Sequence, residues 1–484
     1  MTETTLTEKV RKAGKVGAAR ASGSSRSQLR QRFWRWHFFA GLLVVPFVIL
    51  LATTGSIYIL KPQIDAFEEQ RIHQRSITIT QDQAPLEASV LLEGLLANHP
   101  QANLSQYTLA KPDDRTVEIE LKHSASEGSS ARVGATAVTY WVDQYSGEVL
   151  AYKASEKRFL YMVKKLHSEL LAGNNGSYIV ELVASWTIIL LITGLYLWVS
   201  SAGFSLPKLF RIDWSNQTLR WRHLHGVLGL VIALPLFLIL MSGLPWTQLW
   251  GSNYKSVISK LGWDGPGQEW FVTLQSAAPS GVDLDALDGG LWEISDADET
   301  DNSVTDSIPL GQIAISHIAA KEEVRSLVPP VNVIPPKPNN GVWTVRSMPA
   351  DRSQRVTLHY DQYSGDQIMR IGFENHHPFE RFVSSGISFH EGALFGWLNQ
   401  ALVLLTAIST IALSVLGFVI WWRRRPKNEL SAPPKAQCPL SISFISAIVA
   451  LGIFLPAAGI SMLVVAVLEF VWARFWIARP ALEV

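Results

Sequence analysis

The chain has 484 residues, of which 48% are hydrophobic, a share that favours a membrane protein with sizeable soluble parts. Its 42 Lys and Arg almost balance its 41 Asp and Glu, so the net charge gives no sign of a nucleic-acid partner. The single Cys438 excludes an intramolecular disulfide and any CxxC redox or zinc motif. Redox chemistry in this chain therefore requires a bound cofactor.

The N-terminal tail is strongly basic. Residues 1–36 contain nine Lys or Arg and two acidic residues, whereas residues 251–389 contain eighteen acidic residues and ten Lys or Arg. The first 32 residues are polar and rich in Ser, Ala and Gly, with no short apolar core before a cleavage site. This composition predicts a disordered basic tail and no cleaved signal peptide.

Four apolar stretches are long enough to cross about 30 Å of hydrocarbon, which takes about 20 helical residues. A fifth apolar region, residues 440–477, is too long for one untilted helix, and the sequence FLPAAG in its middle indicates a turn. That region is either a transmembrane hairpin or a single long, kinked helix. The four clear spans are Phe38–Leu60, Ile179–Val199, Val227–Leu249 and Leu398–Trp422.

The distribution of Lys and Arg beside the spans predicts the topology, because cytoplasmic loops carry an excess of both. The basic tail, the loop 201–222 and the loop 424–439 fall on one side of the membrane. We therefore expect a multi-pass protein with a cytoplasmic N-terminus. The two long segments between spans then lie outside, in the periplasm of a Gram-negative cell.

Both outer segments are predicted to be small α+β modules. Helical periodicity and alternating apolar residues indicate one helix and several strands in each. An acidic and proline-rich insertion, at 283–306 and 328–340, is predicted to be loop. The first module is expected to have a helix at 86–97 and strands at 106–110, 116–122 and 137–142, and the second a helix at 310–320 and strands at 342–347 and 356–360.

The two halves of the chain resemble each other. VTYWVDQYSGE at 138–148 and VTLHYDQYSGD at 356–366 share seven of eleven positions. His37 and His225 are each followed by glycines 4 and 18 residues later, and His167 and His390 by glycines 6 and 27 residues later. Each half is therefore a span, an outer module and a second span, with one histidine at the inner end of the first span and one at the outer end of the second.

These observations predict an integral membrane α-helical bundle of four core helices in two parallel repeats, with one or two C-terminal helices and two small α+β modules. The predicted boundaries are 1–32 for the tail, 33–60, 166–200, 223–250 and 389–423 for the core spans, 61–165 and 251–388 for the modules, 201–222 and 424–439 for the basic loops, and 440–477 for the C-terminal region.

Two copies of the same topology imply a pseudo-two-fold axis along the membrane normal. Across that axis His37 is expected to meet His225 near the cytoplasmic face, and His167 to meet His390 near the outer face. Two imidazoles per site are the axial ligands that low-spin haem b requires, so the sequence predicts two b haems. Two arginines near the inner site, Arg35 and Arg222, are candidates to pair with haem propionates.

The four histidines also have a simpler interpretation. Any of them can instead be an ordinary residue at the membrane surface. His223 lies two residues from His225 and is a second candidate ligand, but two helical steps turn it by about 200°, and the repeat selects His225.

Three further polar residues need a role. His376 and His377 are either loop residues or contacts for an external substrate. Glu181 lies inside a span, where it would couple protons, hydrogen bond to an axial histidine, or form a buried structural pair. No phosphate-binding glycine motif follows a strand, so we expect the chain to bind neither NAD(P)H nor ATP.

Several motifs of the chain point to a known family. They are Trp34–His37, Leu166-His167, Thr193–Trp198, Arg222–Gly226, the two Asp-x-Tyr-Ser-Gly turns and Phe389–Glu391. These motifs resemble those of the PepSY-associated transmembrane family, which includes ferric-siderophore reductases of the bacterial inner membrane. The resemblance extends to about Pro426, but the span 398–422 of the second half lacks the Thr-Gly-Leu-Tyr of the first.

The resemblance implies an inner-membrane di-haem oxidoreductase of the ferric-siderophore reductase type. It implies that the four histidines bind the two haems, and that electrons pass from an unknown donor to a ferric siderophore or another iron chelate in the periplasm, which supports iron release and uptake. Two alternatives remain: a PepSY membrane protein that binds peptides or has a regulatory role without redox chemistry, and a di-haem cytochrome that serves another oxidoreductase.

Overall fold

The structure is a computed structural model. It describes residues 3–73, 84–111, 114–123, 136–263, 265–266, 274–276, 313–337, 341–425, 433 and 441–476, and for residues 3–26, 73, 136, 473, 475 and 476 it describes the backbone alone. The chain forms two compact units. The helix unit comprises Met1–Ile59, Lys164–Val257 and Phe395–Val484, and the sheet unit comprises Leu60–Val163 and Ile258–Leu394.

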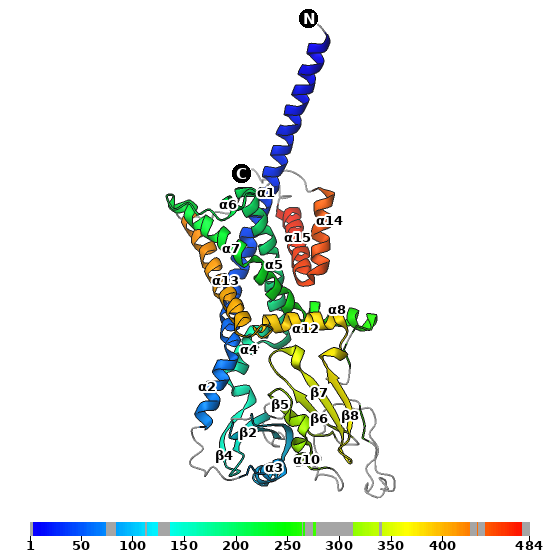
Figure 1. Ribbon diagram of the computed structural model, residues 1–484. Helices are drawn as coiled ribbons and strands as arrows, with labels where there is room; N and C mark the ends of the chain where they lie inside the picture. The colour runs from blue at the N-terminus through cyan, green and yellow to red at the C-terminus, as the bar shows by residue number, and fades with distance from the viewer. Residues whose placement is uncertain are drawn as a thin grey trace. The chain divides into compact units, whose positions relative to one another are not determined.

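Four long helices dominate the helix unit (Figure 1). They are α1 (Glu3–Ile59), α5 (Gly173–Ala202), α7 (Gln217–Gly243) and α13 (Trp397–Arg424). Each contains a segment long and apolar enough to cross a membrane, which confirms the four predicted spans by length and composition. The backbone of α1 is helical from Glu3 onward, although the sequence predicts a disordered tail there.

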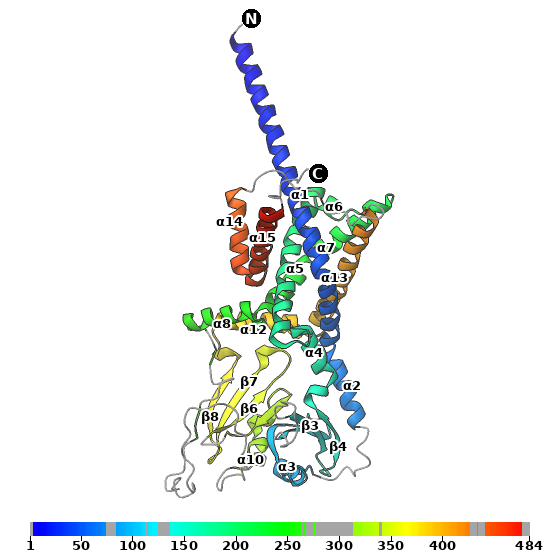
Figure 2. The same cartoon turned by 180° about the vertical axis from the view of Figure 1, so that it is seen from behind.

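The four helices pack as a ring. α1 and α7 each pack against both α5 and α13, so α1 and α7 occupy one diagonal of the bundle and α5 and α13 the other. Figure 2 shows the same helices from behind. Shorter helices of the connections are α4 (Phe159–Glu169), α6 (Leu206–Leu209), η2 (Leu244–Trp246) and α8 (Leu249–Leu261).

The C-terminal region is a hairpin of α14 (Ile442–Phe454) and α15 (Pro456–Trp476), which lie side by side in Figures 1 and 2. The turn falls at Leu455, which is fully buried, so the region is two helices and not a single long one, while its crossing of the membrane stays a prediction. The indole Nε1 of Trp186 on α5 donates to Ser461 Oγ at 3.0 Å and ties the hairpin to the bundle. With 13 residues, α14 is about 20 Å long, shorter than the hydrocarbon core of a bilayer.

The sheet unit contains one eight-stranded antiparallel sheet with the strand order β4-β3-β2-β1-β5-β6-β7-β8. The sequence predicts two separate modules, but β1 pairs with β5 through Tyr107↔Val333 and Thr108↔Asn332, so both halves share one sheet. The strands are β1 (Ala102–Thr108), β2 (Thr116–His123), β3 (Thr136–Asp143), β4 (Val149–Ala154), β5 (Val331–Ile334), β6 (Val342–Ser347), β7 (Val356–Asp361) and β8 (Gln367–Gly372).

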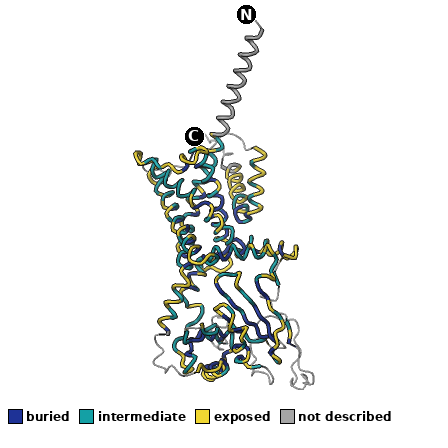
Figure 3. The backbone as a smooth tube through the Cα atoms, viewed as in Figure 1, coloured by how far each residue is buried: buried dark blue, intermediate teal, exposed yellow. Residues whose placement is uncertain are grey.

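One hydrophobic core joins the two halves of the sheet unit. α3 (Ala88–Ala97) and α10 (Ile315–Ala320) supply residues to it, and the hydroxyls of Ser89 and Ser316 are 2.6 Å apart. Within the sheet unit, the dark blue that marks buried residues in Figure 3 runs along the strands. The remaining helices with residues in this unit are α2 (Lys61–His73), η1 (Ser155–Lys157), α11 (Glu322–Arg325), η4 (Arg352–Gln354), η5 (Phe373–Asn375) and α12 (Pro378–His390).

The repeated Asp-Gln-Tyr-Ser-Gly sequence forms the same turn twice. Asp143 Oδ1 accepts hydrogen bonds from the two following amides at positions 145 and 146, and Asp361 Oδ1 accepts from those at 363 and 364. Gly147 and Gly365 both have φ +73°, a conformation that glycine adopts without strain. Each turn leads into a further strand, β4 or β8, which the sequence pattern does not predict.

Most of the expected strands and helices of the sheet unit are present. The strands at 116–122, 137–142, 342–347 and 356–360 are confirmed, the helix at 86–97 begins at Ala88, and β1 begins before its expected position at 106–110. The prediction of loop at 328–340 is wrong for β5, because the prolines flank the strand and leave its amides free to pair. The segment 283–306 lies outside the described residues, and α10 begins at Ile315 within the expected helix.

We predict that Gly459→Ala loosens the C-terminal hairpin. A Cβ at Gly459 would lie too close to the carbonyl oxygen of Gly452, so α14 and α15 would have to separate. Overpacking of this kind costs about 1–3 kcal/mol, which should lower the melting temperature of the detergent-purified protein. Gly94→Ala is the control, because a Cβ there meets nothing within 4 Å. Equal melting temperatures for the two variants would contradict the close crossing.

Candidate functional site

Two histidines face each other inside the helix unit. His37 on α1 and His225 on α7 belong to the diagonal pair of helices, and their ring centroids are 6.4 Å apart with an angle of 86° between the ring planes. The sequence predicts this meeting from the repeat, and the structure brings the two rings together. Both side chains keep an intermediate solvent exposure, as do all ten residues from Trp221 to Leu230 of α7.

The hydrogen bonds of these rings fix which nitrogen carries the proton. His225 Nδ1 lies 3.1 Å from the carbonyl oxygen of Leu413, which can only accept, so Nδ1 is the donor. His37 Nδ1 lies 3.0 Å from Thr193 Oγ1. That hydroxyl donates its own proton to the carbonyl of Ile189 at 2.8 Å, so it accepts from His37. In both rings Nε2 is left with a free lone pair.

His167 on α4 is held in the same way at the other end of α1. Its Nδ1 lies 3.0 Å from the carbonyl oxygen of Leu51 and 3.1 Å from Thr54 Oγ1, so here too Nε2 carries the lone pair. A Cβ on Gly55 would come within 3.1 Å of the His167 ring. Gly55 follows His37 by 18 residues, a rise of about 27 Å along a helix. His37 and His167 therefore lie at opposite ends of the bundle.

A glycine stands beside each of these three imidazoles. The acceptor carbonyl of Leu413 lies four residues before Gly417, and that of Leu51 four residues before Gly55. In an α-helix the carbonyl of residue i−4 points at the amide of residue i, so a ring that reaches this carbonyl passes over residue i. A side chain there would crowd the ring: a Cβ on Gly55 would lie 3.1 Å from His167 Cε1, closer than most real contacts, and one on Gly417 would lie 3.4 Å from His225 Cε1, at the limit of ordinary contact.

His37 follows the same arrangement on α5. A Cβ on Gly194 would lie 3.0 Å from His37 Cε1, and the backbone of Leu190, four residues earlier, is a further hydrogen-bond partner of the ring. From the sequence, Gly194 and Gly417 are notable only because each lies 27 residues after a repeated histidine. Gly41 and Gly229 are closer in sequence to the histidines. A Cβ on either would instead meet a leucine side chain, at 3.9 Å for Gly41 and 3.6 Å for Gly229.

The spacing of the paired rings can be compared with that of two imidazoles on one transition metal ion. Imidazole nitrogens bind such ions at about 2.0–2.1 Å, so two rings on opposite sides of one metal have centres roughly 6 Å apart. The observed separation of 6.4 Å between His37 and His225 fits this arrangement. Perpendicular ring planes are compatible with it, since both planes can contain the axis through the metal. Within the described residues, no group of three or more His, Cys, Asp or Glu side chains is placed to hold a metal ion.

The fourth predicted histidine, His390, is the last residue of α12 in the sheet unit. The segment around it is held by Arg352, whose Nη2 donates to Glu391 Oε1 at 3.3 Å and whose backbone amide donates to Ser388 Oγ at 3.0 Å. His167 belongs to the helix unit, so the pairing of His167 with His390 stays a prediction.

His223 has a different role from its neighbour His225. Its Nδ1 accepts a hydrogen bond from the backbone amide of Asp213 at 3.0 Å, and its ring packs edge-on against Trp198 at 5.7 Å. His223 therefore anchors the loop before α7 and does not face His37. The selection of His225 from the repeat agrees with this geometry.

Glu181 is fully buried and stabilises the start of α8. Its Oε2 accepts a hydrogen bond from the backbone amide of Leu249 at 2.8 Å, and its Oε1 accepts from that of Trp250 at 3.1 Å. A carboxylate at a helix N-terminus satisfies amides that have no partner in the helix and is favoured by the helix dipole. The contacts support the structural alternative for this residue, while a role in proton coupling stays a prediction.

The two arginines expected near the inner site both contact protein groups. Arg35 donates to the carbonyl of Pro433 and lies 4.9 Å from the Phe39 ring centre, and Arg222 Nη2 donates to Ser201 Oγ at 3.4 Å. The charges that act on Arg222 are those of Arg424 and Arg30. This cluster of three arginines at the basic end of the bundle attracts anions.

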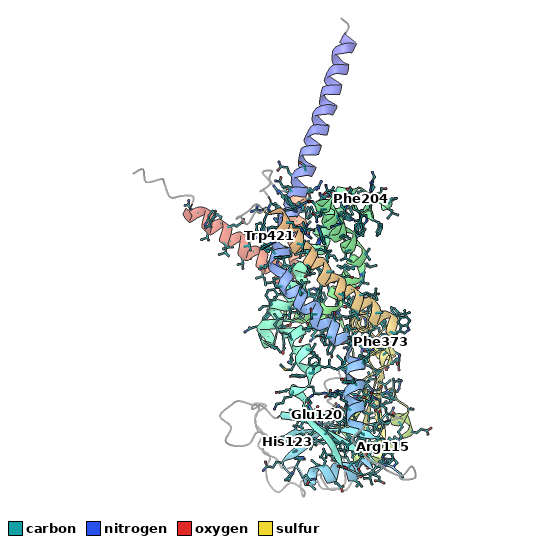
Figure 4. All side chains as sticks on the ribbon, turned by 90° about the vertical axis from the view of Figure 1, so that its left-hand side faces the viewer. Arg115, Glu120, His123, Phe204, Phe373 and Trp421 are labelled. Atoms are coloured by element: carbon teal, nitrogen blue, oxygen red, sulfur yellow. The ribbon has the colours of Figure 1, made fainter. Side chains whose placement is uncertain are left out.

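Two indole groups at the same end do not stand out in the sequence. The Nε1 atoms of Trp221 and Trp421 are buried and have no hydrogen-bond partner among the described residues. Arg423 lies over the Trp221 ring at 5.5 Å, and Trp421 lies on α13, as labelled in Figure 4. Indole N–H groups donate hydrogen bonds to anionic oxygens as readily as to neutral ones.

His376 and His377 have partners within the sheet unit. His376 Nδ1 lies 3.1 Å from Glu380 Oε2. His377 Nδ1 accepts a hydrogen bond from the Phe379 amide at the start of α12, and its ring stacks on Trp263 with centroids 5.1 Å apart and planes 7° apart. These contacts give both histidines a structural role, and their contact with a substrate stays a prediction.

Residues 34–424 match the family model of the PepSY-associated TM region. The chain belongs to the PepSY-associated TM family. Together with the four apolar helices, this makes it a multi-pass membrane protein. The match begins three residues before His37 and ends with α13, so it covers all the histidines described above. No curated protein matches the chain.

We predict that Glu181→Ala destabilises this PepSY-associated TM protein more than Glu181→Gln does. Alanine leaves two amides at the start of α8 without an acceptor, at a cost of about 1–3 kcal/mol for each buried group. Glutamine keeps one acceptor oxygen. The melting temperatures should therefore fall in the order wild type, Glu181→Gln, Glu181→Ala. An unchanged melting temperature for Glu181→Ala would rule out the capping role.

Proposed function

We propose that the protein carries electrons across the bacterial inner membrane through two b haems and reduces a ferric siderophore in the periplasm. The observation that carries the proposal is the His37–His225 pair, in which two free Nε2 atoms lie within the bundle at a ring spacing of 6.4 Å. His37 and His225 would be the axial ligands of the inner haem. Bound haem supplies one-electron oxidation and reduction of its iron.

The chain's own contribution at this site is to orient the two imidazoles. A ligating histidine whose second nitrogen donates to an oxygen is held at a fixed rotation and binds metal more strongly. Thr193 Oγ1 and the Leu413 carbonyl perform this function for His37 and His225. Gly194 and Gly417 let the rings approach the helices that carry these acceptors.

The basic end of the bundle suits the propionate carboxylates of an inner haem. Guanidinium groups pair well with carboxylates, and Arg222 with its neighbours Arg30 and Arg424 forms a positively charged cluster there. The indole N–H groups of Trp221 and Trp421 add two hydrogen-bond donors. We propose that the propionates of the inner haem bind at this end of the bundle, where Arg35 and Arg222 would pair with them.

The second haem is proposed at the other end of the bundle, with His167 and His390 as its ligands. His167 supports this part, because its Nδ1 is hydrogen bonded to the Leu51 carbonyl and its Nε2 carries the lone pair, as in the His37–His225 pair. The rise of about 27 Å between the levels of His37 and His167 is close to the thickness of the hydrocarbon core. Two cofactors would thus divide the membrane into shorter electron-transfer steps.

The proposed direction of electron flow is based on charge. The excess of arginine and lysine at the basic end of the bundle supports a cytoplasmic location for that end, and the sheet unit is then proposed to lie in the periplasm. An electron that reaches a ferric siderophore converts Fe³⁺ to Fe²⁺. Hard oxygen ligands such as hydroxamates hold Fe²⁺ less tightly, and iron is released. The electron donor is left unassigned.

We predict that the purified protein contains two b haems and that His37→Ala and His225→Ala each remove the same one. The double variant should retain as much haem as either single variant, because both ligands serve one site. His223→Ala is the matched control on the same helix and should keep two haems, since His223 bonds to the Asp213 amide. Haem per chain is measured from the pyridine haemochrome spectrum. A colourless wild-type protein would favour the peptide-binding or regulatory alternative.

We also predict that the reduced protein is reoxidised by a ferric siderophore. The dithionite-reduced protein is mixed anaerobically with ferric hydroxamate siderophore, and the b-type absorption bands are followed in time. The haems are expected to be oxidised faster than with the iron-free siderophore. One ferrous ion should appear for each haem that is oxidised. A haem-containing protein that stays reduced would instead support the cytochrome alternative, in which electrons go to another oxidoreductase.

A further inference from the structure

A cluster of potential metal ligands in the sheet unit contains none of the residues of the proposed haem sites. His99 follows the C-terminal end of α3, His123 is the last residue of β2, and Tyr140 lies in β3. The ring centroids of His99 and His123 are 5.4 Å apart, and those of His99 and Tyr140 are 5.0 Å apart. Three elements therefore bring two imidazoles and one phenol together, and Figure 4 labels His123 at this place.

The strand register explains why the groups converge. Ile119 pairs with Tyr140, and His123 pairs with Thr136. Residues two apart on a strand point to the same side of a sheet, so His123 shares the face of Ile119 and Tyr140, which is the face packed against α3. The cluster thus lies at the edge of the hydrophobic core of the sheet unit. Apolar side chains would be enough to cover that edge, so packing alone does not explain why two imidazoles and a phenol are found there.

Hydrogen bonding within the cluster places two of the ligand atoms. His123 Nε2 lies 3.1 Å from the hydroxyl oxygen of Tyr140. Ligands at about 2.0–2.2 Å from one metal ion, on neighbouring positions, are themselves roughly 3 Å apart. A metal ion can therefore take the place of the shared proton without moving either residue far. His99, perpendicular to His123 at 88°, is the third group within reach.

We propose that His99, His123 and Tyr140 bind one Cu²⁺ ion. Imidazole nitrogen and phenolate oxygen both suit Cu²⁺, and among divalent first-row metals it binds most tightly to such sites. Binding replaces the Tyr140 O–H bond with a copper–oxygen bond and releases one proton to solvent, with no change in oxidation state. The site shares no residue with the proposed electron pathway, because none of its three ligands is among the proposed haem ligands.

The surroundings favour imidazoles that are ready to bind. Burial, and then the nearby His99, lower the pKa of His123, so this ring is neutral at neutral pH and offers a lone pair. Both histidines have intermediate solvent exposure, which leaves a route for an ion from solvent. Tyr152, exposed and stacked on Tyr140 at 5.9 Å, lies beside the cluster and is not one of the proposed ligands.

The test is a Cu²⁺ titration of the full-length purified protein, followed by electron paramagnetic resonance and by competition with a chromophoric chelator. The wild type should bind one Cu²⁺ with nitrogen hyperfine structure and a phenolate-to-copper absorption band. The double variant His99→Ala/His123→Ala should bind it at least about tenfold more weakly, the loss expected for a damaged metal site. Tyr152→Phe, the matched control, should bind as the wild type does.

Tyr140→Phe keeps the ring packing of the core and tests the oxygen ligand separately. It should abolish the absorption band while keeping nitrogen ligation, and it should retain the wild-type melting temperature even if the double histidine variant does not fold. Equal copper affinity in the wild type and the double variant would overturn the site. Persistence of the absorption band in Tyr140→Phe would also overturn it.

Discussion

The helix unit depends on one contact, in which an imidazole Nδ1–H reaches a helix carbonyl beside a glycine. The carbonyl of residue i−4 lies next to residue i, so the histidine can approach only where residue i has no side chain. Gly417 satisfies this condition for His225 and Gly55 for His167. A Cβ in place of the glycine would lie 3.1 Å from the His167 ring, which would have to move by a few tenths of an ångström, and 3.4 Å from the His225 ring. Without the carbonyl acceptor the tautomer of either ring would not be fixed.

This constraint determines how the four helices must pack. His37 contacts α5 and His225 contacts α13, so each histidine joins the first and second span of its own half. Because α1 and α7 lie on one diagonal of the ring, two rings that are each held to a neighbouring helix point toward the centre and meet. The meeting of the two rings thus follows from two separate helix–helix contacts and needs no direct packing between α1 and α7.

The sequence predicted the long-range pattern better than the local contacts. Repeated spacings around His37 and His225 identified the pair, since equal intervals in two halves place equivalent residues at equivalent levels. The acceptors Thr193 and Leu413 were beyond prediction, because one is a common hydroxyl and the other a backbone carbonyl. For Glu181 the sequence indicated burial but not its partner, which is a helix end that follows a short 3-10 turn. The shared sheet was missed because β5 is only four residues long and lies between prolines.

The most direct test of the central claim is the low-temperature electron paramagnetic resonance spectrum of the oxidised protein, compared with that of His225→Ala. If His37 and His225 bind one haem iron, and His167 and His390 the other, the wild type shows only low-spin ferric haem. Loss of one imidazole should then leave a five-coordinate, high-spin signal or remove that haem's signal. An unchanged low-spin spectrum in His225→Ala, with the same haem content as the wild type, would contradict the claim.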